Sequence, residues 1–466
     1  MSFERGSRPL QYAARSLRCQ SVPDMRRAQL LPVVVLGVMS AAGVRAAGID
    51  DATVDAAAKA VAPQVTEWRR DFHRNPELSN REFQTSKKVA AQLQAFGLEV
   101  HTGIAHTGVV GVLHGGKPGP TIALRSDMDA LPVAEQVDLP FKSTATGEYR
   151  GEKVGVMHAC GHDGHMAMLL GIAKIMSQMR KDLPGTVMFI FQPAEEGAPD
   201  GERGGASLML DEKVLDLARP EVIFGMHLFS SQNVGEIGYR SGPAMAGSDR
   251  FSIVVHGKQT HGARPWLGVD PIVTAAQIVL GLQTIVSRQL DVSAYPTILS
   301  VGVFKSGIRN NIIPDQAELI GTFRTFDPKL REEVIMRIKR ISSQIAESAG
   351  ATADFTLGDA PNPVLVNDPS LTARVLPSLQ RVAGAKNVVM VPYMTASEDY
   401  AYFAQKVPSF YFNVGVTPVG TDAQTAPSNH SPQFFMDETA LPLGMRAMLA
   451  VALDYLQGGA TGNPGG

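Results

Sequence analysis

The nine residues Met157–His165, which read Met-His-Ala-Cys-Gly-His-Asp-Gly-His, decide both the fold and the chemistry expected of this chain. They place three imidazoles, a thiol and a carboxylate just ahead of the apolar run Met166–Met176. Because alternate side chains of an extended backbone point the same way, Cys160 and His162 are expected on one side. A thiolate and an imidazole on one face form half of a metal site. The alternative is a capped helix start whose histidines face solvent.

Length and composition indicate a globular protein of about two domains. The chain has 466 residues, of which 44% are hydrophobic and 19% are charged. Lys and Arg together number 43 and Asp and Glu 45, so no net charge attracts nucleic acid or an anionic membrane. This balance favours a small-molecule or peptide substrate.

The N-terminal region has the pattern of a secretory signal peptide. Arg26 and Arg27 precede the apolar run Leu30–Val44, and small residues follow it up to Ala46. A basic segment, a short apolar segment and small residues predict cleavage after Ala46 and export, most simply to the periplasm. A retained membrane anchor is the alternative, although the run is short for a membrane span.

The cysteine content strengthens the metal interpretation of the opening stretch. The chain has two cysteines, and cleavage after Ala46 would remove Cys19 and leave only Cys160. A single thiol cannot form an internal disulfide, whereas a metal would hold it as a thiolate. The alternative, an inert buried cysteine, fits poorly beside two histidines and an aspartate.

Acidic residues follow two of the expected strands. The strand Thr121–Leu124 leads to Asp127 and Asp129, which lie where α/β folds place their chemistry or else in a solvated turn. The strand Gly185–Phe191 leads to Glu195 and Glu196. If that segment is extended, its two glutamates point in opposite directions, so one can bind a metal while the other faces a water molecule. A surface acidic turn is the alternative.

The strand Val222–Met226 delivers His227 in the same way, although a lone histidine here could be purely structural. Metal-type ligands thus follow three successive segments of the chain. This recurrence favours a metal hydrolase without reference to any family.

Residues 249–357 follow a different pattern, β-α-β-β-α-β, which is that of a ferredoxin-like unit. The expected elements are strands at Phe251–His256, Pro296–Phe304, Ala317–Arg324 and Ala353–Leu357, with helices at Val269–Leu290 and Leu330–Ser348. The glycines beside His261 indicate a loop that approaches another group closely, or a plain turn. Outside this unit, helices are expected at Asp51–Asn75, Glu82–Phe96, Leu371–Ala383 and Glu438–Leu456, and further strands at Val109–Leu113, Val388–Val391 and Ser409–Gly415.

A family resemblance rests on eight segments that occur in order over nearly all of the mature chain. They are His73–Ser79, Asp127–Pro132, Met157–His165, Pro193–Gly197, Gly225–His227, Thr260–Pro265, Ser397–Asp399 and His430–Pro432. The sequence resembles the metallo-aminohydrolase superfamily of aminoacylases and glutamate carboxypeptidase. More narrowly, it resembles the hippurate hydrolases and indoleacetyl-amino-acid amidohydrolases.

The resemblance implies an α/β metallopeptidase-type catalytic domain, with a mixed central sheet flanked by helices, and an inserted ferredoxin-like α+β domain that acts as a lid and dimerises. The expected boundaries are 1–46 for the signal peptide with its upstream extension, 47–245 and 359–457 for the catalytic domain, 246–358 for the lid, and 458–466 for a disordered tail.

The same resemblance implies a centre of two divalent metal ions, for which zinc, manganese or cobalt are all compatible with the ligands. The implied ligands are Cys160, His162, Glu196, His227 and His430. Glu195 would be the general base, and His261 would polarise the scissile carbonyl, often in the partner subunit's site. Asn311 falls where a lid asparagine would touch substrate. Asp127 would lie behind the ligands, and Asp129 would orient a ligand imidazole.

The expected activity is hydrolysis of N-acyl amino acids or short peptides by a homodimer that, once mature, needs neither nucleic acid nor a membrane. A carboxypeptidase acting on peptides is one alternative. A non-catalytic, exported metal-binding protein is the other, and it would need neither Glu195 nor His261.

Overall fold

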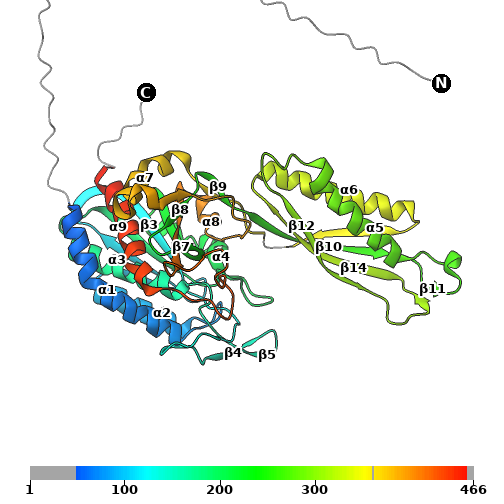
Figure 1. Ribbon diagram of the computed structural model, residues 1–466, viewed down its shortest axis with the longest axis horizontal. Helices are drawn as coiled ribbons and strands as arrows, with labels where there is room; N and C mark the ends of the chain where they lie inside the picture. Colours follow the sequence, from blue (N-terminus) through cyan, green and yellow to red (C-terminus); the bar gives the residue numbers. More distant parts are fainter. Residues whose placement is uncertain (1–48, 359–360, 459–466) are drawn as a thin grey trace, which may run out of the picture. The chain divides into compact units, whose positions relative to one another are not determined.

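The computed structural model describes residues 49–358 and 361–458, so the expected signal peptide and nearly all of the expected tail lie outside the described residues. The larger part is built on an eight-stranded mixed sheet (Figure 1). In spatial order its strands are β1 (Glu99–Ile104), β2 (Gly108–His114), β6 (Pro184–Gln192), β3 (Lys117–Asp127), β7 (Val222–Asn233), β18 (Ser409–Thr417), β8 (Ile237–Tyr239) and β17 (Val388–Met390). The central strands β6, β3, β7 and β18 are parallel, which brings their carboxyl ends to one edge.

Both faces of this sheet are buried, because alternate residues of each central strand enter different cores. Leu124, Phe189 and Phe224 face one core, whereas Met188 and Ile223 face the other. Burial on both sides explains why these strands read as continuous apolar runs. Helices α1 (Asp51–Arg74), α2 (Phe83–Ala95), α3 (His162–Gln178), α7 (Pro369–Ala383) and α9 (Leu441–Gly458) cover the first face, and α4 (Gly205–Asp211) and α8 (Ala401–Ala404) the second.

A second, four-stranded antiparallel sheet has the order β12-β14-β10-β15, which is the ferredoxin-like arrangement. Its strands are β12 (Ile298–Ser306), β14 (Gln316–Thr325), β10 (Gly247–His256) and β15 (Thr352–Leu357), and helices α5 (Pro271–Thr284) and α6 (Pro328–Ser348) pack on one face around their own core. The expected α/β fold with a separate ferredoxin-like unit is therefore confirmed.

Aspartate–proline pairs start three of the helices. Asp270, Asp327 and Asp368 each accept hydrogen bonds from backbone N–H groups of the first turn, and proline is the first residue of α5, α6 and α7. The carboxylate satisfies helix N–H groups that have no partner within the helix, and proline there gives up no hydrogen bond.

Three pairs of short strands also occur among the described residues, and, like β1 and β8, none of them was expected from the sequence. Strands β4 (Thr146–Tyr149) and β5 (Glu152–Gly155) form a largely exposed hairpin that has no apolar alternation. The other short strands are β9 (Gly242–Met245) with β16 (Leu365–Asn367), and β11 (Thr260–His261) with β13 (Ile312–Ile313). Short helical turns lie at Val214–Leu217, Pro265–Leu267, Ile285–Gln289, Ala385–Asn387 and Glu438–Ala440.

Candidate metal centre

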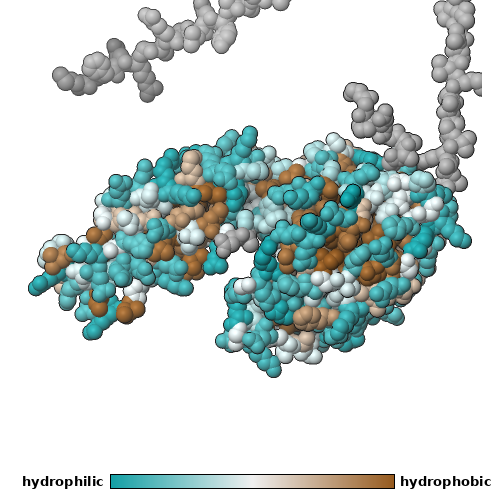
Figure 2. Space-filling model, turned by 180° about the vertical axis from the view of Figure 1, so that it is seen from behind, coloured by the Kyte–Doolittle hydropathy of each residue, from teal (hydrophilic) through white to brown (hydrophobic). Residues whose placement is uncertain are grey.

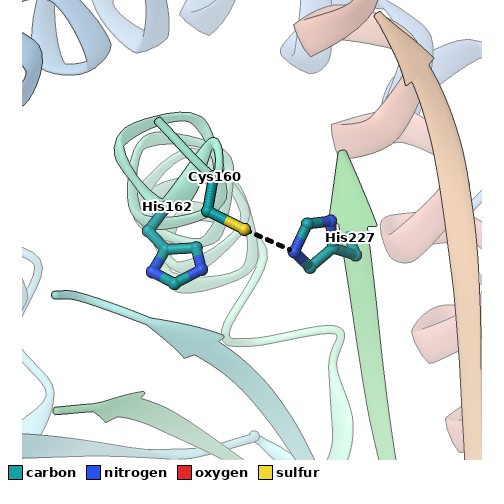
Figure 3. A group of neighbouring side chains, drawn as sticks. All are labelled: Cys160, His162 and His227. Atoms are coloured by element: carbon teal, nitrogen blue, oxygen red, sulfur yellow. Dashed lines mark hydrogen bonds between the residues drawn. The ribbon is translucent and has the colours of Figure 1, made fainter. Parts of the chain in front are cut away.

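Three of the expected ligands converge at the carboxyl edge of the parallel strands. Helix α3 begins at His162, and β7 carries His227 beside it (Figure 3). The Sγ atom of Cys160 lies 3.3 Å from Nε2 of His227. Candidate ligand atoms of Cys160, His162 and His227 all lie within 4.8 Å of one another. All three side chains are buried.

The backbone from Cys160 to His162 is not extended as the sequence led us to expect, but turns at Gly161. Gly161 adopts a left-handed φ of 98° and caps α3, so Cys160 and His162 converge across a turn. Glycine takes this conformation without the steric cost that a Cβ atom would bring. His227 likewise lies inside β7, because the strand continues through polar residues to Asn233.

A second group of ligands shares the same thiol. Nε2 of His430 lies 3.2 Å from Sγ of Cys160 and 3.1 Å from Oε1 of Glu196. Asn429 holds this loop in place: its amide donates to the carbonyl oxygens of Cys160 (3.0 Å) and Leu228 (2.9 Å). Cys160 therefore belongs to two three-residue groups, each compact enough to hold one cation.

Glu195 and Glu196 occupy a turn after β6, so the expectation of an extended segment was wrong. The preceding residue, Ala194, has a φ of 53°, and its N–H donates to the buried carboxylate of Glu82 at 3.0 Å. Both glutamates consequently reach His162, whose Nε2 lies 3.9 Å from Glu195 Oε2 and 4.0 Å from Glu196 Oε1.

Hydrogen bonds fix the ring orientation of the two buried ligand histidines, His162 and His227. Nδ1 of His162 donates to the backbone carbonyl of Asp129 at 2.8 Å, and Nδ1 of His227 donates to that of Leu228 at 2.9 Å. Each ring thereby keeps its Nε2 atom for a ligand, the usual arrangement around protein-bound metals. Asp129 thus orients His162 mainly through its backbone, while its carboxylate accepts from Ser79 and from the N–H of Glu196.

His165, the third histidine of the stretch Met157–His165, belongs to neither of the two groups that contain Cys160. Nδ1 of His165 lies 2.5 Å from Oδ1 of Asp127, and its Nε2 accepts the N–H of Leu228 at 2.9 Å. With both nitrogens engaged, His165 ties α3 to β7 beside the ligands.

Two buried atoms test whether a cation fits. Nε2 of His162 has no hydrogen-bond partner among the described residues, and Oε1 of Glu196 has none beyond its ion-pair contact with Nε2 of His430. Without a cation, burial and the charge of Glu196 raise the pKa of the Cys160 thiol. Burial and the carboxylates of Glu398 and Glu196 likewise hold the pKa of Glu195 well above its usual range. These acidic groups resist ionisation when no cation is present. A bound divalent cation would stabilise their ionised forms.

A buried guanidinium lies behind this cluster. Arg125 contacts the carboxylates of Asp127 (2.7 Å), Asp399 (2.9 Å) and Glu398 (3.0 Å). Oxygen atoms of Glu195, Glu398 and Asp399 lie within 4.8 Å of one another. Arg125 therefore balances acidic groups beside Glu195, a role that sequence reasoning missed because two of its three partners, Glu398 and Asp399, are far away in the chain.

His261 and Asn311 do not join this group within the described residues. Both are exposed, and they neighbour each other: the N–H of Gly262 donates to the Asn311 carbonyl at 2.8 Å. Nδ1 of His261 accepts the N–H of Ala263.

This fold and its ligand set are those of a metal-dependent hydrolase. The chain belongs to peptidase family M20/M25/M40, whose model matches residues 123–454. It is 40% identical to thermostable carboxypeptidase 2 of Saccharolobus solfataricus (84% of this chain, 96% of that one). It is 36% identical to IAA-amino acid hydrolase ILR1-like 2 of Arabidopsis thaliana (85% and 87%). Among solved structures, the Bacillus subtilis YXEP protein, a dinuclear metal binding peptidase, matches with a TM-score of 0.71 and 35% identity (85% and 99%). The family resemblance noted in the sequence is thereby confirmed.

Proposed function

We propose that this enzyme hydrolyses the amide bond of N-acyl amino acids at a centre of two divalent cations, to each of which Cys160 could supply a ligand. The observation that carries the proposal is the position of Glu195, whose side chain is 9% exposed and lies next to two ligand groups with one thiol in common. A purely metal-binding protein would not need this extra carboxylate. The likeness to an amino-acid-conjugate hydrolase supports the substrate class, and the likeness to a carboxypeptidase keeps short peptides as the alternative.

The ligand roles follow from the two groups. Cys160, His162 and His227 would hold one cation, and Cys160, Glu196 and His430 the other. Their donor atoms are compatible with zinc, manganese or cobalt. When bound, such cations make water more acidic and polarise a carbonyl group.

Glu195 is the proton carrier in this proposal. Its carboxylate lies 3.9 Å from Nε2 of His162, close enough to the ligands to take a proton from the attacking water and return it to the leaving amine. Arg125 pairs with the carboxylates of Glu398 and Asp399 behind Glu195 and so offsets the negative charge that gathers there.

We further propose that the enzyme is a homodimer in which His261 completes the partner's site. On one chain His261 is exposed and makes no described contact with the ligands, which suits a residue that serves another subunit. Asn311, its neighbour, would contact substrate from the same loop.

The edge strand β12 and helix α5 carry exposed apolar side chains, including Ile298, Phe304 and Leu280. Figure 2 shows apolar (brown) side chains between polar ones on this smaller unit. An open strand edge beside apolar surface is a typical site of self-association.

We also propose that the protein is exported, on the basis of the N-terminal pattern alone. In an oxidising compartment, a bound metal would hold the lone thiol of the mature chain, Cys160, as a metal-bound thiolate.

The test measures substrate and metal together. The purified enzyme is stripped with a chelator, reloaded separately with zinc, manganese or cobalt, and assayed on N-acetyl and N-benzoyl amino acids and on dipeptides. We expect about two cations per chain and hydrolysis of acyl amino acids that depends on them. Hydrolysis of dipeptides alone would favour the carboxypeptidase, and bound metal without any hydrolysis would contradict catalysis.

A further inference from the structure

A cavity of about 520 Å³ adjoins the candidate metal centre, and Glu196 forms part of its wall. Four segments enclose it: residues 78–81 before α2, the residues after β3, the β4–β5 hairpin, and residues 196–202 after β6. Its size lies within the usual range of small-ligand pockets, about 300–1,000 Å³. Because Glu196 belongs to a ligand group and also lines the cavity, a molecule bound at the centre could extend into it.

One part of the cavity wall is apolar. Leu78, Leu131, Pro132 and Pro199 supply aliphatic surface, and Tyr149 adds an aromatic ring. Such a lining favours an uncharged, apolar group.

Charged side chains form the other part of the wall and bear on which half of the substrate can enter. Two guanidiniums, Arg81 and Arg150, lie there with three carboxylates besides that of the ligand Glu196: Glu148, Asp200 and Glu202. Arg81 is engaged by Glu202 (3.0 Å) and Arg150 by Asp200 (3.2 Å), so neither cation is free for a substrate carboxylate. The carboxylate of an amino acid would meet net repulsion here, whereas an acyl group carries no charge.

The wall is built by specific local structure. The hairpin turns through Arg150 and Gly151, both with positive φ (53° and 80°). The Arg150 guanidinium lies 5.3 Å from the centre of the Tyr149 ring while pairing with Asp200 on the opposite loop. Asn80 holds the same loop by donating to Glu202 and to the Arg203 carbonyl.

We propose that this cavity binds the acyl group of the substrate and selects large apolar acyl groups, with Tyr149 and Ala198 as residues that determine specificity. The inference rests on the proposed function, because it concerns the acyl half of an N-acyl amino acid.

The test compares two substrate series. One keeps the amino acid and enlarges the acyl group from acetyl through butyryl to benzoyl; the other keeps acetyl and varies the amino-acid side chain. Ala198→Trp fills the cavity, Tyr149→Ala removes its aromatic wall, and Lys153→Ala on the same hairpin is the control, since Lys153 does not line the cavity. We expect both cavity variants to lower the benzoyl-to-acetyl ratio of kcat/KM by about 10-fold or more, mainly through KM. Lys153→Ala should leave that ratio as it is. Metal content and melting temperature establish that each variant is folded and loaded.

An unchanged benzoyl-to-acetyl ratio, or a loss that follows the amino-acid side chain instead, would overturn the acyl assignment while leaving the hydrolase proposal intact. If the parent enzyme hydrolysed neither series, the proposed function would fail, and the acyl assignment with it.

Discussion

The Sγ atom of Cys160 and the Nε2 atom of His430 lie 3.2 Å apart, although 270 residues separate them in the chain. The same thiol lies at a similar distance from His227, so one side chain joins both groups of metal-type ligands. Changes at Cys160 should therefore affect both cations at once.

The first prediction concerns that shared thiol. Cys160→Ser should lower metal content well below that of the parent and reduce activity by more than about 100-fold, since even residues that only support metal ligands contribute 10–100-fold to affinity. Metal analysis of the dialysed protein checks this. His165→Gln, which alters a neighbour of the ligands, is the comparison: an equal loss of metal in both variants would contradict a special role for the thiol.

Glu195→Gln tests the proton carrier. The substitution keeps the size of the side chain but removes the basic carboxylate, so kcat should fall by about 10²–10⁴-fold. Metal content should stay at the parental level. Turnover at the parental rate would exclude Glu195 as the base.

The pH dependence of the metal-free protein provides a third prediction. The contacts of His430 with Cys160 and Glu196 raise its pKa from 6.5 to about 10. Because the folded-state pKa is the higher one, His430 stabilises the metal-free fold below about pH 6.5 and loses this contribution as the pH rises toward 10. We expect the melting temperature of chelator-treated protein to fall over this range, and to fall less for His430→Ala. Added cation should reduce the slope, since it takes the place of the protons. Identical slopes for parent and variant would contradict this.

Arg125→Met tests the buried charge network. Removing the guanidinium leaves three buried carboxylates without their cation, which should cost about 3 kcal/mol or more of unfolding free energy. Urea denaturation measures this. Arg125→Lys keeps the charge but not the planar fork, so it should fall between parent and Arg125→Met.

Subunit mixing tests the proposed role of His261. His261→Ala and Glu195→Gln should each be inactive alone. If His261 serves the partner's site, refolding an equal mixture should restore about a quarter of parental activity, because half of the dimers are mixed and each has one complete site. No recovery would assign His261 to the site of its own chain, and full activity of His261→Ala alone would exclude a catalytic role for it.

Much of the fold could be predicted from the sequence because its signals are local. The Asp-Pro pairs mark three helix starts, and the apolar runs mark strands that are buried on both faces. The β4–β5 hairpin escaped notice because exposed polar strands leave no hydrophobic period.

The candidate site was only partly accessible from the sequence. Spacing pointed to Cys160, His162 and the glutamates, whereas His430 rested on the family resemblance. Arg125 could not have been assigned, because its contacts with Glu398 and Asp399 cross some 274 residues. Nothing local in Arg125-Ser126-Asp127 distinguishes a buried cation from a surface one.

The distance along the chain from Cys160 to His430 also orders events during synthesis. A ribosome that has translated the opening stretch has still to add 270 residues before the last ligand exists. During that interval Cys160 gains first His227, 67 residues on, and only later His430. If the two ligand groups bind cations as proposed, the group that contains His430 can be completed only after the C-terminal segment has been made and has docked.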